Sequence, residues 1–576
     1  MANVRVNLDT KEFPYNFREL GATVVISTTL DATNPPSCGA YYLDNILPIS
    51  RGFASAAFTA HIPSIISIPS TVLSCRRITA SDGSLAYLAI TIDSIYVFDT
   101  LGPNWRYLIP IVPSSLPTFA LVKGEYYIFL PGDFKIMHYD FQLGVLTEVF
   151  TTGLDLTEIA GIAGAGDRMI LWTAGRILWS SIFDPLDFVP SLTTGAGSTS
   201  VLAIDSVITL CLSLGSDFII YTAANAVAAR RTNDFNNPYT FDGIKGSAGV
   251  TDSRHVAENS NNAVHIVWTA SGFQQVTVQE ATYIFTELSD GIARAIITSV
   301  LPSTQQPSLT RSSALNVAVT FSSNRLLCIS TGLASLDYYT DAYILDTALG
   351  RWGKLTANHS TFLNYWPVAL ANVITYAEIP ALVPTYDDFS LPYYAYGVNE
   401  VLIPSIPGDN FGIVTPEGAI LTVAPNDTAN YRGALVGLVA ATPRLYLGKF
   451  KLAASEGALV HSVVLTDLHA GQVILHGHGQ NGEFSQRVTG LAQDPRMPGV
   501  WFGNISANAV SLEITGTFTL TDLSLAIERT GSINQFSPDT YTDRQIVVGD
   551  LDVINGSLRT LYHPPTNPST TVPQSS

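Results

Sequence analysis

The chain contains 576 residues, of which 47% are hydrophobic and only 13% are charged, and its net charge is −18. This composition excludes a disordered chain, because so many apolar residues can bury a large core. It also excludes tight binding of nucleic acid, which requires clustered cations to neutralise phosphates. The densest cationic stretches are only Arg76-Arg77 and Arg230-Arg231. A surface poor in charge favours a protein that packs against other copies of itself or other proteins.

The cysteines and the N-terminal residues further limit the class of protein to which the chain can belong. Cys38, Cys75, Cys211 and Cys328 are far apart and form no Cys-x-x-Cys pattern. The sequence therefore predicts neither a zinc site nor a disulfide framework, and it favours folding in the cytosol. Cys211 and Cys328 lie in apolar runs and are expected to be buried free thiols. Met1–Lys11 lacks the apolar segment of a signal peptide, and no apolar run is long enough to span a membrane, so we expect neither export by a cleaved signal nor membrane insertion.

After a predicted N-terminal arm, residues 1–20, the chain from 21 to 424 is dominated by short strands rich in Val, Ile, Tyr and Phe and bounded by Gly, Asp, Asn or Ser. The clearest predicted strands are Thr23–Ser27, Ala86–Thr91, Ser94–Phe98, Tyr126–Leu130, Lys135–Tyr139, Met169–Thr173, Phe218–Thr222, Val264–Thr269 and Tyr343–Leu345. The centres of the second strands recur every forty to fifty residues, at Tyr87, Tyr126, Met169, Phe218 and His265. This spacing fits one four-stranded blade, so the sequence predicts an all-β fold, a β-propeller of about six to eight blades.

One short pattern occurs three times within this region, in 96–105, 137–146 and 343–352. In each case an apolar strand ends in Asp, a tight turn carries Leu-Gly, and a large apolar residue opens the next strand. The Asp and Gly residues form the pairs Asp99 with Gly102, Asp140 with Gly144, and Asp346 with Gly350. We interpret the pattern as a blade hairpin in which the Asp side chain caps the turn.

The regular spacing of the predicted strands ends after His265. Residues Leu288–Leu301 predict a helix between blades, with Ser289 as N-cap and an apolar face. Blade-like strands resume at 317–319, 326–330 and 343–355, and a further one is expected at 370–377. The Pro- and Tyr-rich stretch from Pro380 to Pro407 predicts a connection or an arm, and Ile379–Pro407 is the candidate for gating or partner contact.

A different pattern begins near residue 424. Alternating segments predict a C-terminal antiparallel β-sandwich within residues 425–563. Its expected strands are Gly433–Ala440, Arg444–Phe450, Ala458–Leu465, Gln472–His476, Val510–Thr515 and Leu520–Ile527. The Pro-, Ser- and Thr-rich residues 564–576 are expected to form a flexible tail.

Glycoside-cleaving propellers are the main enzymatic alternative, because they need two carboxylates facing each other across a sugar. The turn from Asp346 to Trp352 resembles the Asp-box of sialidases, but its Gly and Trp stand in the wrong register, which favours a structural hairpin with Trp352 between blades. The scattered acids form no recognisable pair in the sequence: Asp155, Glu158, Asp184, Asp187, Glu280 and Asp290. Pairing of acids distant in the sequence stays open.

Two other clusters favour structural roles. His476 and His478 would share one face of a strand, with His461 and His469 upstream, and could hold a metal. The nearest downstream acid is Glu483, however, and exposed hairpin histidines are the simpler interpretation. The glycine-rich residues 161–168 lack a phosphate-binding pattern and are expected to form a turn before a strand. We therefore predict no catalytic, cofactor-binding or metal-binding residue, no cofactor, and no enzymatic activity.

Five ordered features occupy residues 177–297. They are Trp179-Ser180, the Asp184-Pro-Leu-Asp-Phe188 turn, the apolar run 212–221 with the Phe-rich loop that ends in Gly246-Ser-Ala-Gly249, the Trp268-Thr-Ala-Ser-Gly-Phe273 strand, and Leu288-Ser-Asp-Gly-Ile292. In this order they resemble the tail nozzle or hub (tail tubular) proteins of double-stranded DNA bacteriophages, chiefly short-tailed ones. Residues 446–452 and 527–531 are similar to the sandwich of the same family.

The resemblance implies a structural virion protein of a phage tail, assembled in the host cytoplasm. It implies a homo-oligomer, typically a hexameric ring, that joins the tail, contacts adaptor and fibre proteins, and lines or closes the DNA exit channel. We expect DNA to pass transiently without tight binding, because an acidic conduit repels it. The alternative is a receptor-binding or glycan-degrading β-propeller, and a cellular adaptor propeller is a third interpretation.

Overall fold

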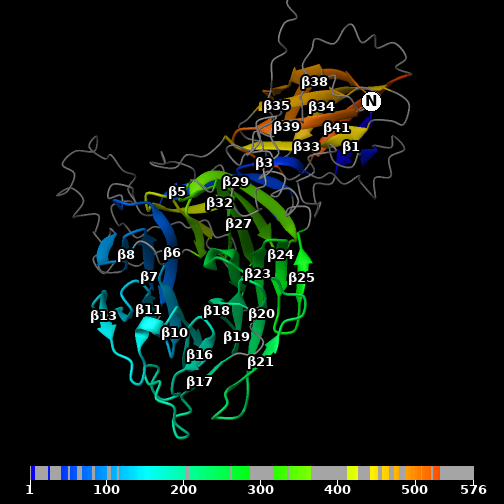
Figure 1. Ribbon diagram of the computed structural model, residues 1–576. Helices are drawn as coiled ribbons and strands as arrows, with labels where there is room; N and C mark the ends of the chain where they lie inside the picture. The colour runs from blue at the N-terminus through cyan, green and yellow to red at the C-terminus, as the bar shows by residue number, and fades with distance from the viewer. Residues whose placement is uncertain are drawn as a thin grey trace, which may run out of the picture.

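The structure is a computed structural model in which the described chain is almost entirely β-strand (Figure 1). It has two single-turn 3-10 helices, Leu156–Glu158 and Ser253–His255, and no α-helix among the described residues. The model describes residues 2–6, 24–25, 40–49, 52–60, 68–80, 85–99, 105–112, 116–200, 206–259, 263–285, 315–322, 325–333, 336–364, 411–425, 442–451, 457–465, 472–478, 487–493, 495–496, 499–507, 509–520 and 523–531.

Five consecutive four-stranded antiparallel sheets form blades 1 to 5. Each blade follows the chain from an inner to an outer strand, and Figure 1 shows the blades arranged around a common centre. Their strands are β6 (Val72–Thr79), β7 (Leu85–Thr91), β8 (Ser94–Phe98) and β9 (Arg106–Pro110); β10 (Thr118–Val122), β11 (Glu125–Leu130), β12 (Lys135–Asp140) and β13 (Val145–Val149); β14 (Gly161–Ala165), β15 (Arg168–Trp172), β16 (Arg176–Trp179) and β17 (Gly197–Ser200); β18 (Ile208–Leu214), β19 (Asp217–Thr222), β20 (Ala226–Arg231) and β21 (Tyr239–Gly243); and β22 (Val256–Asn259), β23 (Val264–Thr269), β24 (Gly272–Val276) and β25 (Ala281–Ile284).

A ten-stranded sheet supplies the last two blades. Blade 6 contains β26 (Leu315–Phe321), β27 (Leu326–Leu333), β28 (Tyr339–Asp346) and β29 (Arg351–His359). Blade 7 contains β30 (Thr361–Asn364), β31 (Phe411–Val414) and β32 (Ile420–Pro425), and its outer strand is β5 (Phe53–Ala60) from the N-terminal part of the chain. The short strand β4 (Ile46–Pro48) pairs with both β29 and β5, and so joins blade 6 to blade 7. The described residues therefore form seven blades.

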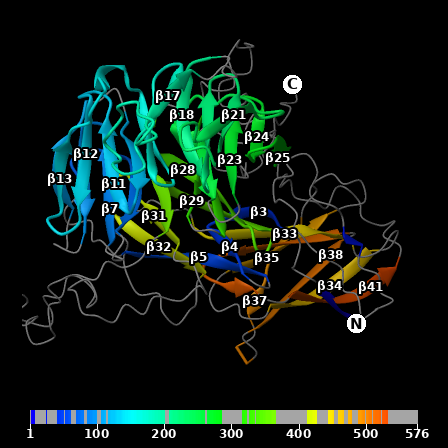
Figure 2. The same cartoon turned by 90° about the horizontal axis from the view of Figure 1, so that it is seen from below.

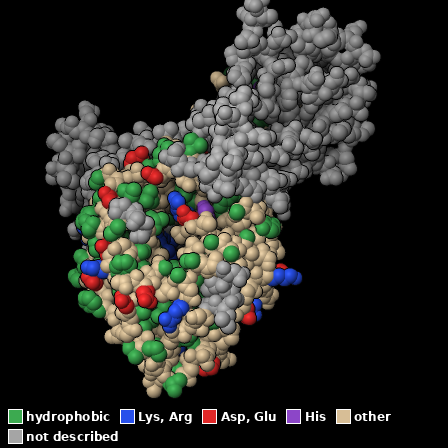
Figure 3. All heavy atoms as spheres, viewed as in Figure 1, with side chains coloured by type: hydrophobic (Ala, Val, Ile, Leu, Met, Phe, Trp, Pro, Cys, Tyr) green, Lys and Arg blue, Asp and Glu red, His purple; other side chains and the backbone are tan. Residues whose placement is uncertain are grey.

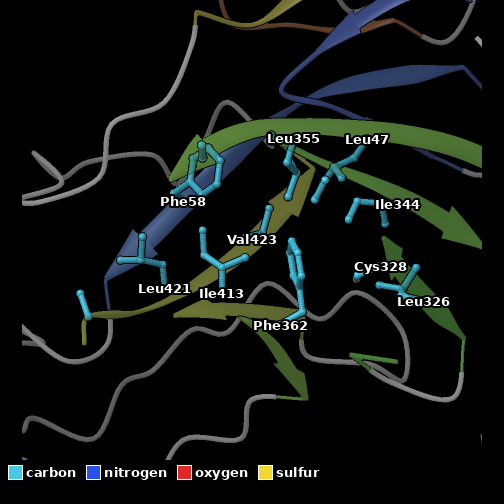
Figure 4. Packing of buried hydrophobic residues seen from close by; sticks show 14 residues of the cluster. Leu47, Phe58, Leu326, Cys328, Ile344, Leu355, Phe362, Ile413, Leu421 and Val423 are labelled. Carbon is cyan, nitrogen blue, oxygen red and sulfur yellow. The ribbon is translucent and has the colours of Figure 1, made fainter. Parts of the chain in front are cut away.

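Seven apolar cores hold the ring together, one between each pair of neighbouring blades. Because successive side chains of a strand point to opposite faces of its sheet, each strand contributes residues to two cores. In β19, Phe218 and Ile220 pack against blade 3, whereas Ile219 and Tyr221 pack against blade 5. Figure 4 shows the core between blades 6 and 7, in which Phe58 and Phe362 of blade 7 share one cluster with Cys328 and Ile344 of blade 6. The ring closes where blade 7 meets blade 1.

The closing contact is both apolar and polar. Leu363, Val414 and Ile420 of blade 7 pack against residues of blade 1 that include Tyr87. In addition, the indole Nε1 of Trp105 donates a hydrogen bond of 2.7 Å to the Gly418 carbonyl oxygen. Blade 1 and blade 7 therefore make the same kind of contact as blades that are adjacent in the sequence.

Two further sheets form the C-terminal sandwich, seen at the upper right of Figure 1. One sheet has the order β1-β41-β34-β38-β37, and the other has the order β2-β33-β39-β35-β36 with β3 also paired to β33. The strands are β1 (Ala2–Val6), β2 (Val24–Val25), β3 (Ala40–Asp44), β33 (Arg444–Lys451), β34 (Gly457–Leu465), β35 (Gln472–His478), β36 (Arg487–Gly490), β37 (Ala492–Gln493), β38 (Val500–Ala507), β39 (Ala509–Thr515) and β41 (Leu523–Gly531). Segments from both ends of the chain thus share this unit.

The sandwich joins the propeller at blades 6 and 7 (Figure 2). The chain leaves β3 at Asp44 and enters β4 at Ile46, with only Asn45 between them. From the other direction, β40 (Thr519–Leu520) pairs with β5. The Ser55 and Phe518 backbones are also linked, since Ser55 N–H donates to the Phe518 carbonyl oxygen at 2.8 Å.

The predicted fold class is confirmed, and the number of blades falls within the predicted range. Tyr87, Tyr126, Met169, Phe218 and His265 each lie in the second strand of a blade, as their spacing indicated. Cys211 and Cys328 are buried free thiols, as predicted. The predicted helix 288–301, the predicted segments 370–377, 379–407 and 433–440, and the predicted tail 564–576 lie outside the described residues.

Because β5 closes the ring, we expect Phe58→Ala to lower the free energy of unfolding strongly. Phe58 is buried between blades 6 and 7, and removal of a buried Phe side chain costs about 3–5 kcal/mol. We expect the free energy of unfolding to fall by that amount in a denaturant titration. Phe150 is 78% exposed, so Phe150→Ala, as the matched control, should change stability by less than about 0.5 kcal/mol. Equal losses in the two variants would contradict the proposed role of β5.

Candidate functional site

The repeated Asp-Gly pattern forms the same turn in two blades. In blade 2, the backbone N–H groups of Gln142 and Leu143 donate to Oδ1 of Asp140, and the Gly144 N–H donates to the Asp140 carbonyl oxygen. Gly144 has a φ of 63°, the left-handed conformation that favours glycine. The Asp140 side chain therefore caps the turn, as the sequence predicted.

Blade 6 repeats this geometry. Asp346 Oδ1 accepts from the N–H groups of Ala348 and Leu349, and Gly350 has a φ of 65°. Trp352 is buried in the core between blades 5 and 6. The turn that resembles an Asp-box is therefore a structural hairpin, and its carboxylate is engaged by the turn backbone and by the Arg325 guanidinium.

Asp99 has a different role from its two counterparts. Its side chain is buried and accepts hydrogen bonds from the Arg106 guanidinium at 2.6 Å and the Tyr139 hydroxyl at 2.8 Å. Because Tyr139 belongs to blade 2, Asp99 links blades 1 and 2. Its predicted turn partner, Gly102, lies outside the described residues.

The glycine-rich residues 161–168 are not the turn that we expected. Gly161–Ala165 is β14, the inner strand of blade 3, and the turn comes only at Gly166, with a φ of 59°. Close packing explains these glycines. A Cβ at Gly161 would lie 2.2 Å from the Trp172 ring, and one at Gly164 would lie 2.2 Å from the Leu121 carbonyl oxygen. Gly164 therefore allows the inner strands of blades 2 and 3 to approach each other, and Gly161 leaves room for the Trp172 ring of its own blade.

The expectation of an exposed His476 is wrong. His476 is buried in the sandwich, and its Nε2 lies 2.7 Å from Oε2 of Glu513 on the neighbouring strand β39. Arg444 contacts the other carboxylate oxygen at 2.6 Å. Burial raises the pKa of Glu513, but the hydrogen bond from His476 and the charge of Arg444 outweigh it, so the net shift is downward. The sequence missed this partner because Glu513 is far from His476 along the chain.

A second buried histidine links blades 4 and 5. Nε2 of His265 lies 2.8 Å from the Ser213 carbonyl oxygen and must donate to it. Nδ1 therefore accepts the hydrogen bond of 2.8 Å from the Tyr221 hydroxyl. Burial lowers the pKa of His265, which favours this neutral form. The interaction is a structural link inside a core.

The features that resemble the nozzle proteins occupy blades 3 to 5, and their large residues lie inside. Trp179, Phe188, Trp268 and Phe273 are all buried between blades. Gly249 lies so close to the preceding blade that a Cβ there would be 1.8 Å from the Ala223 carbonyl oxygen. The last feature, 288–292, lies outside the described residues. The large residues of the described features thus pack consecutive blades against one another.

The structure places four of the six scattered acids on two adjoining loops. Asp155 and Glu158 follow blade 2, while Asp184 and Asp187 belong to the loop before the outer strand of blade 3. The two loops form a parallel bridge at Thr152 and Asp187. Glu280 lies apart, bridged to Lys245 between blades 4 and 5, and Asp290 lies outside the described residues.

The centre of the propeller is not acidic. On the seven inner strands, the charged residues are Arg76, Arg77 and Glu258, all within the described part of the chain. The Arg76 guanidinium lies 5.0 Å from the centroid of the Phe119 ring. Figure 3 shows a hollow at the middle of this face, with basic side chains in and beside it and an acidic side chain and a histidine at its rim. Within the described residues, the inner strands therefore carry no excess of acidic side chains.

A buried charged cluster connects the propeller to the sandwich. Lys354 of blade 6 lies 2.9 Å from Oδ1 of Asp341, on the adjacent strand, and 3.5 Å from Oδ1 of Asp44, at the end of β3. The Thr356 hydroxyl lies 2.7 Å from Asp44 and 3.3 Å from Asp341, and the Thr356 N–H donates to Oδ1 of Asn45. Two carboxylates, one from each side of the junction, therefore share one ammonium. Burial raises the pKa of Asp341 to about 6, although the Lys354 charge opposes this rise.

The described residues contain no group of three or more His, Cys, Asp or Glu side chains placed to hold a metal ion. Nor does any helix among them have the length and apolar character needed to span a membrane. The contacts of Arg106 with Asp99, Arg325 with Asp346, Lys354 with Asp341 and His476 with Glu513 each tie neighbouring strands together.

No protein-family model and no curated protein matches the sequence. Among solved structures, YCF48 from Cyanidioschyzon merolae is similar over 64% of this chain and 99% of its own, at 7% identity and a TM-score of 0.36. The extracellular domain of BT4673 from B. thetaiotaomicron is similar over 88% of this chain and 64% of its own, at 9% identity and a TM-score of 0.37. The WD40 repeats of RRP9 give 64% and 100% coverage, 8% identity and a TM-score of 0.35. With TM-scores this low, these likenesses carry no argument about function.

The Asp341 cluster predicts a measurable pH dependence. Because the folded-state pKa is raised from 3.8 to about 6, the folded protein binds the proton more tightly than the unfolded chain does. This contribution to stability is present in acid and is lost as the pH rises through about 6. Asp341→Asn removes it, so the free energy of unfolding of the variant relative to wild type should rise between pH 4 and 7, by on the order of 3 kcal/mol.

Denaturant titrations across this pH range provide the measurement. Asp140→Asn is the matched control, because Asn can retain the oxygen that caps the turn in blade 2. The difference between Asp140→Asn and wild type should not follow this pH profile. A flat difference for Asp341→Asn would show that the carboxyl group is not protonated preferentially in the folded state.

Proposed function

We propose that this chain is a structural virion protein of a double-stranded DNA phage tail, a nozzle or hub subunit. The observation that carries the proposal is the ordered set of features in residues 177–297, which resembles the nozzle or hub family. Blades 3 to 5 accommodate the described features in sequence order, with Trp179, Phe188 and Trp268 inside the cores. This arrangement supports the resemblance, because residues that set the packing of consecutive blades are those that a shared architecture would require.

The proposed role is mechanical. The subunits would form a homo-oligomeric ring, typically hexameric, which meets adaptor and fibre proteins in the virion tail after assembly in the host cytoplasm. An elongated subunit supports this proposal, since the sandwich projects from blades 6 and 7 on one side of the propeller (Figure 1). Two different flanks of one subunit can meet in a head-to-tail contact that closes by rotation. In this proposal the chain has no enzymatic activity.

The DNA path would run between subunits. The propeller's own channel is an unsuitable conduit, because Gly164 and Leu121 bring the inner strands of blades 2 and 3 into close contact and the inner strands carry Arg76 and Arg77. The net charge of −18 resides mainly outside those strands and is available to surfaces that face a central opening of the ring. An acidic wall there would allow DNA to pass without binding.

The mass of the native particle tests the proposal. We expect purified full-length protein to form closed rings of identical subunits by native mass spectrometry, with six-fold averages in electron micrographs. In parallel, release of reducing sugar from bacterial capsular and lipopolysaccharide preparations should stay at the level of a buffer control. A monomer that cleaves these glycans would overturn the proposal in favour of the glycan-degrading alternative, and an inert monomer would overturn it in favour of an adaptor.

A further inference from the structure

We propose that the two bridged loops of blades 2 and 3, residues 150–158 and 181–195, form a docking surface for a basic segment of another protein with apolar side chains. We call this area the blade 2/3 loop surface. In the proposed tail function the partner would be another tail protein, but the surface itself is inferred from the structure alone.

The apolar component is the first observation. Among the most exposed large hydrophobic side chains, three lie on this surface: Leu192 is 80% exposed, Phe150 78% and Phe183 69%. Val189, at 47%, belongs to the second loop as well. Isolated exposed apolar residues are ordinary, but several large ones on adjoining loops indicate an interaction site.

Direct contacts hold the two loops side by side. The Thr152 N–H donates to the Leu186 carbonyl oxygen, and the Phe188 N–H donates to the Thr152 carbonyl oxygen. Val189 lies against Gly153, where a Cβ would be 2.7 Å from its Cγ2. Near the start of the second loop, the Lys123 ammonium donates a hydrogen bond of 2.9 Å to the Phe183 carbonyl oxygen. The surface is therefore built into the propeller.

The second observation is the charge of this surface. Its acids are Asp155, Glu158, Asp184 and Asp187, and neither loop contains a Lys or Arg. The aspartates engage backbone N–H groups, which positions their charges: Asp155 accepts from Thr157, Asp184 from Leu186, and Asp187 from Val189. These bonds hold the carboxylates in place without supplying a countercharge. Figure 3 shows hydrophobic, acidic and some basic side chains over the lower part of the propeller.

Charge complementarity selects the occupant. A partner that covers the apolar residues must lie among four carboxylates and one ammonium, that of Lys123, and this net negative charge favours Lys or Arg on the partner. A second copy of this chain, with its net charge of −18, would be repelled unless it presented a local cationic patch. Two long segments of this chain outside the described residues are also poor candidates. Residues 365–410 contain no Lys or Arg, and residues 532–576 contain two Arg against four Asp.

Binding of short peptides tests the proposal. The probe is a fluorescent peptide in which Lys alternates with Leu and Phe, measured by anisotropy with the full-length protein. The comparison peptides are oligolysine of the same length and the same apolar peptide with Glu in place of Lys. We expect saturable binding of the Lys/Leu/Phe peptide, weakened by salt, and at least about tenfold weaker binding of either comparison peptide.

Variants locate the binding. Phe150→Ser with Leu192→Ser should weaken the Lys/Leu/Phe peptide at least about tenfold, whereas Val207→Ser with Tyr283→Ser, also at exposed positions, should not. The neutral set Asp155→Asn, Glu158→Gln, Asp184→Asn and Asp187→Asn retains oxygens that can cap the same turns. It should weaken binding about tenfold and reduce the salt dependence. The matched set Asp133→Asn, Asp234→Asn, Asp242→Asn and Glu280→Gln removes the same number of charges from other exposed positions and should leave the affinity unchanged.

Two outcomes would overturn the proposal. Equal losses in the surface set and the matched set would mean that the peptide responds only to net charge. Dissociation of the protein's own oligomer by Phe150→Ser with Leu192→Ser, seen by analytical ultracentrifugation, would identify a second copy as the occupant. A wild-type protein that is monomeric but binds the peptide at this surface would contradict the proposed ring and leave this inference standing.

Discussion

The structure depends on closure of seven apolar cores around one axis. A strand such as β19 carries Phe218 and Ile220 on one face and Ile219 and Tyr221 on the other, so its blade is apolar on both faces. An isolated sheet of this kind would leave one or both faces in water. Every blade therefore needs two neighbours, and the ring is complete only when blade 7 packs against blade 1. This requirement explains why the chain returns its N-terminal strand β5 to the last blade.

Closure also determines where the sandwich is attached. Because β5 completes blade 7 and β4 bridges blades 6 and 7, the preceding strand β3 must leave the propeller at the same place. The Asp44–Lys354–Asp341 cluster lies at this exit. A buried ion cluster adds little stability compared with an apolar core, but removal of one member leaves a buried charge without its partner. The cluster thus penalises arrangements that separate β3 from β28 and β29.

The sequence predicted those features that depend on local pattern. Tyr126 and Phe218 marked second strands because blade length is set by neighbouring turns, and Asp346 with Gly350 specified a turn within five residues. Features that depend on distant residues were missed. Nothing near Phe58 indicates that its strand pairs with β32, and nothing near His476 indicates Glu513. Gly161 and Gly164 were misassigned because glycine in a strand and glycine in a turn look alike until the approaching Trp172 ring and Leu121 carbonyl are known.

Packing does not account for the chemistry of the blade 2/3 loop surface. A parallel bridge between the end of one blade and a loop of the next occurs twice, at Thr152 with Asp187 and at Lys245 with Glu280. The second bridge brings opposite charges together, and residues 244–250 and 277–280 include none of the exposed large hydrophobic side chains. A bridge of the same kind can therefore form without exposed large apolar side chains and without an excess of negative charge. Blade packing does not require Phe150 and Leu192 to face water among four carboxylates whose only described basic neighbour on these loops' exposed side is Lys123. We therefore attribute their presence to what binds there.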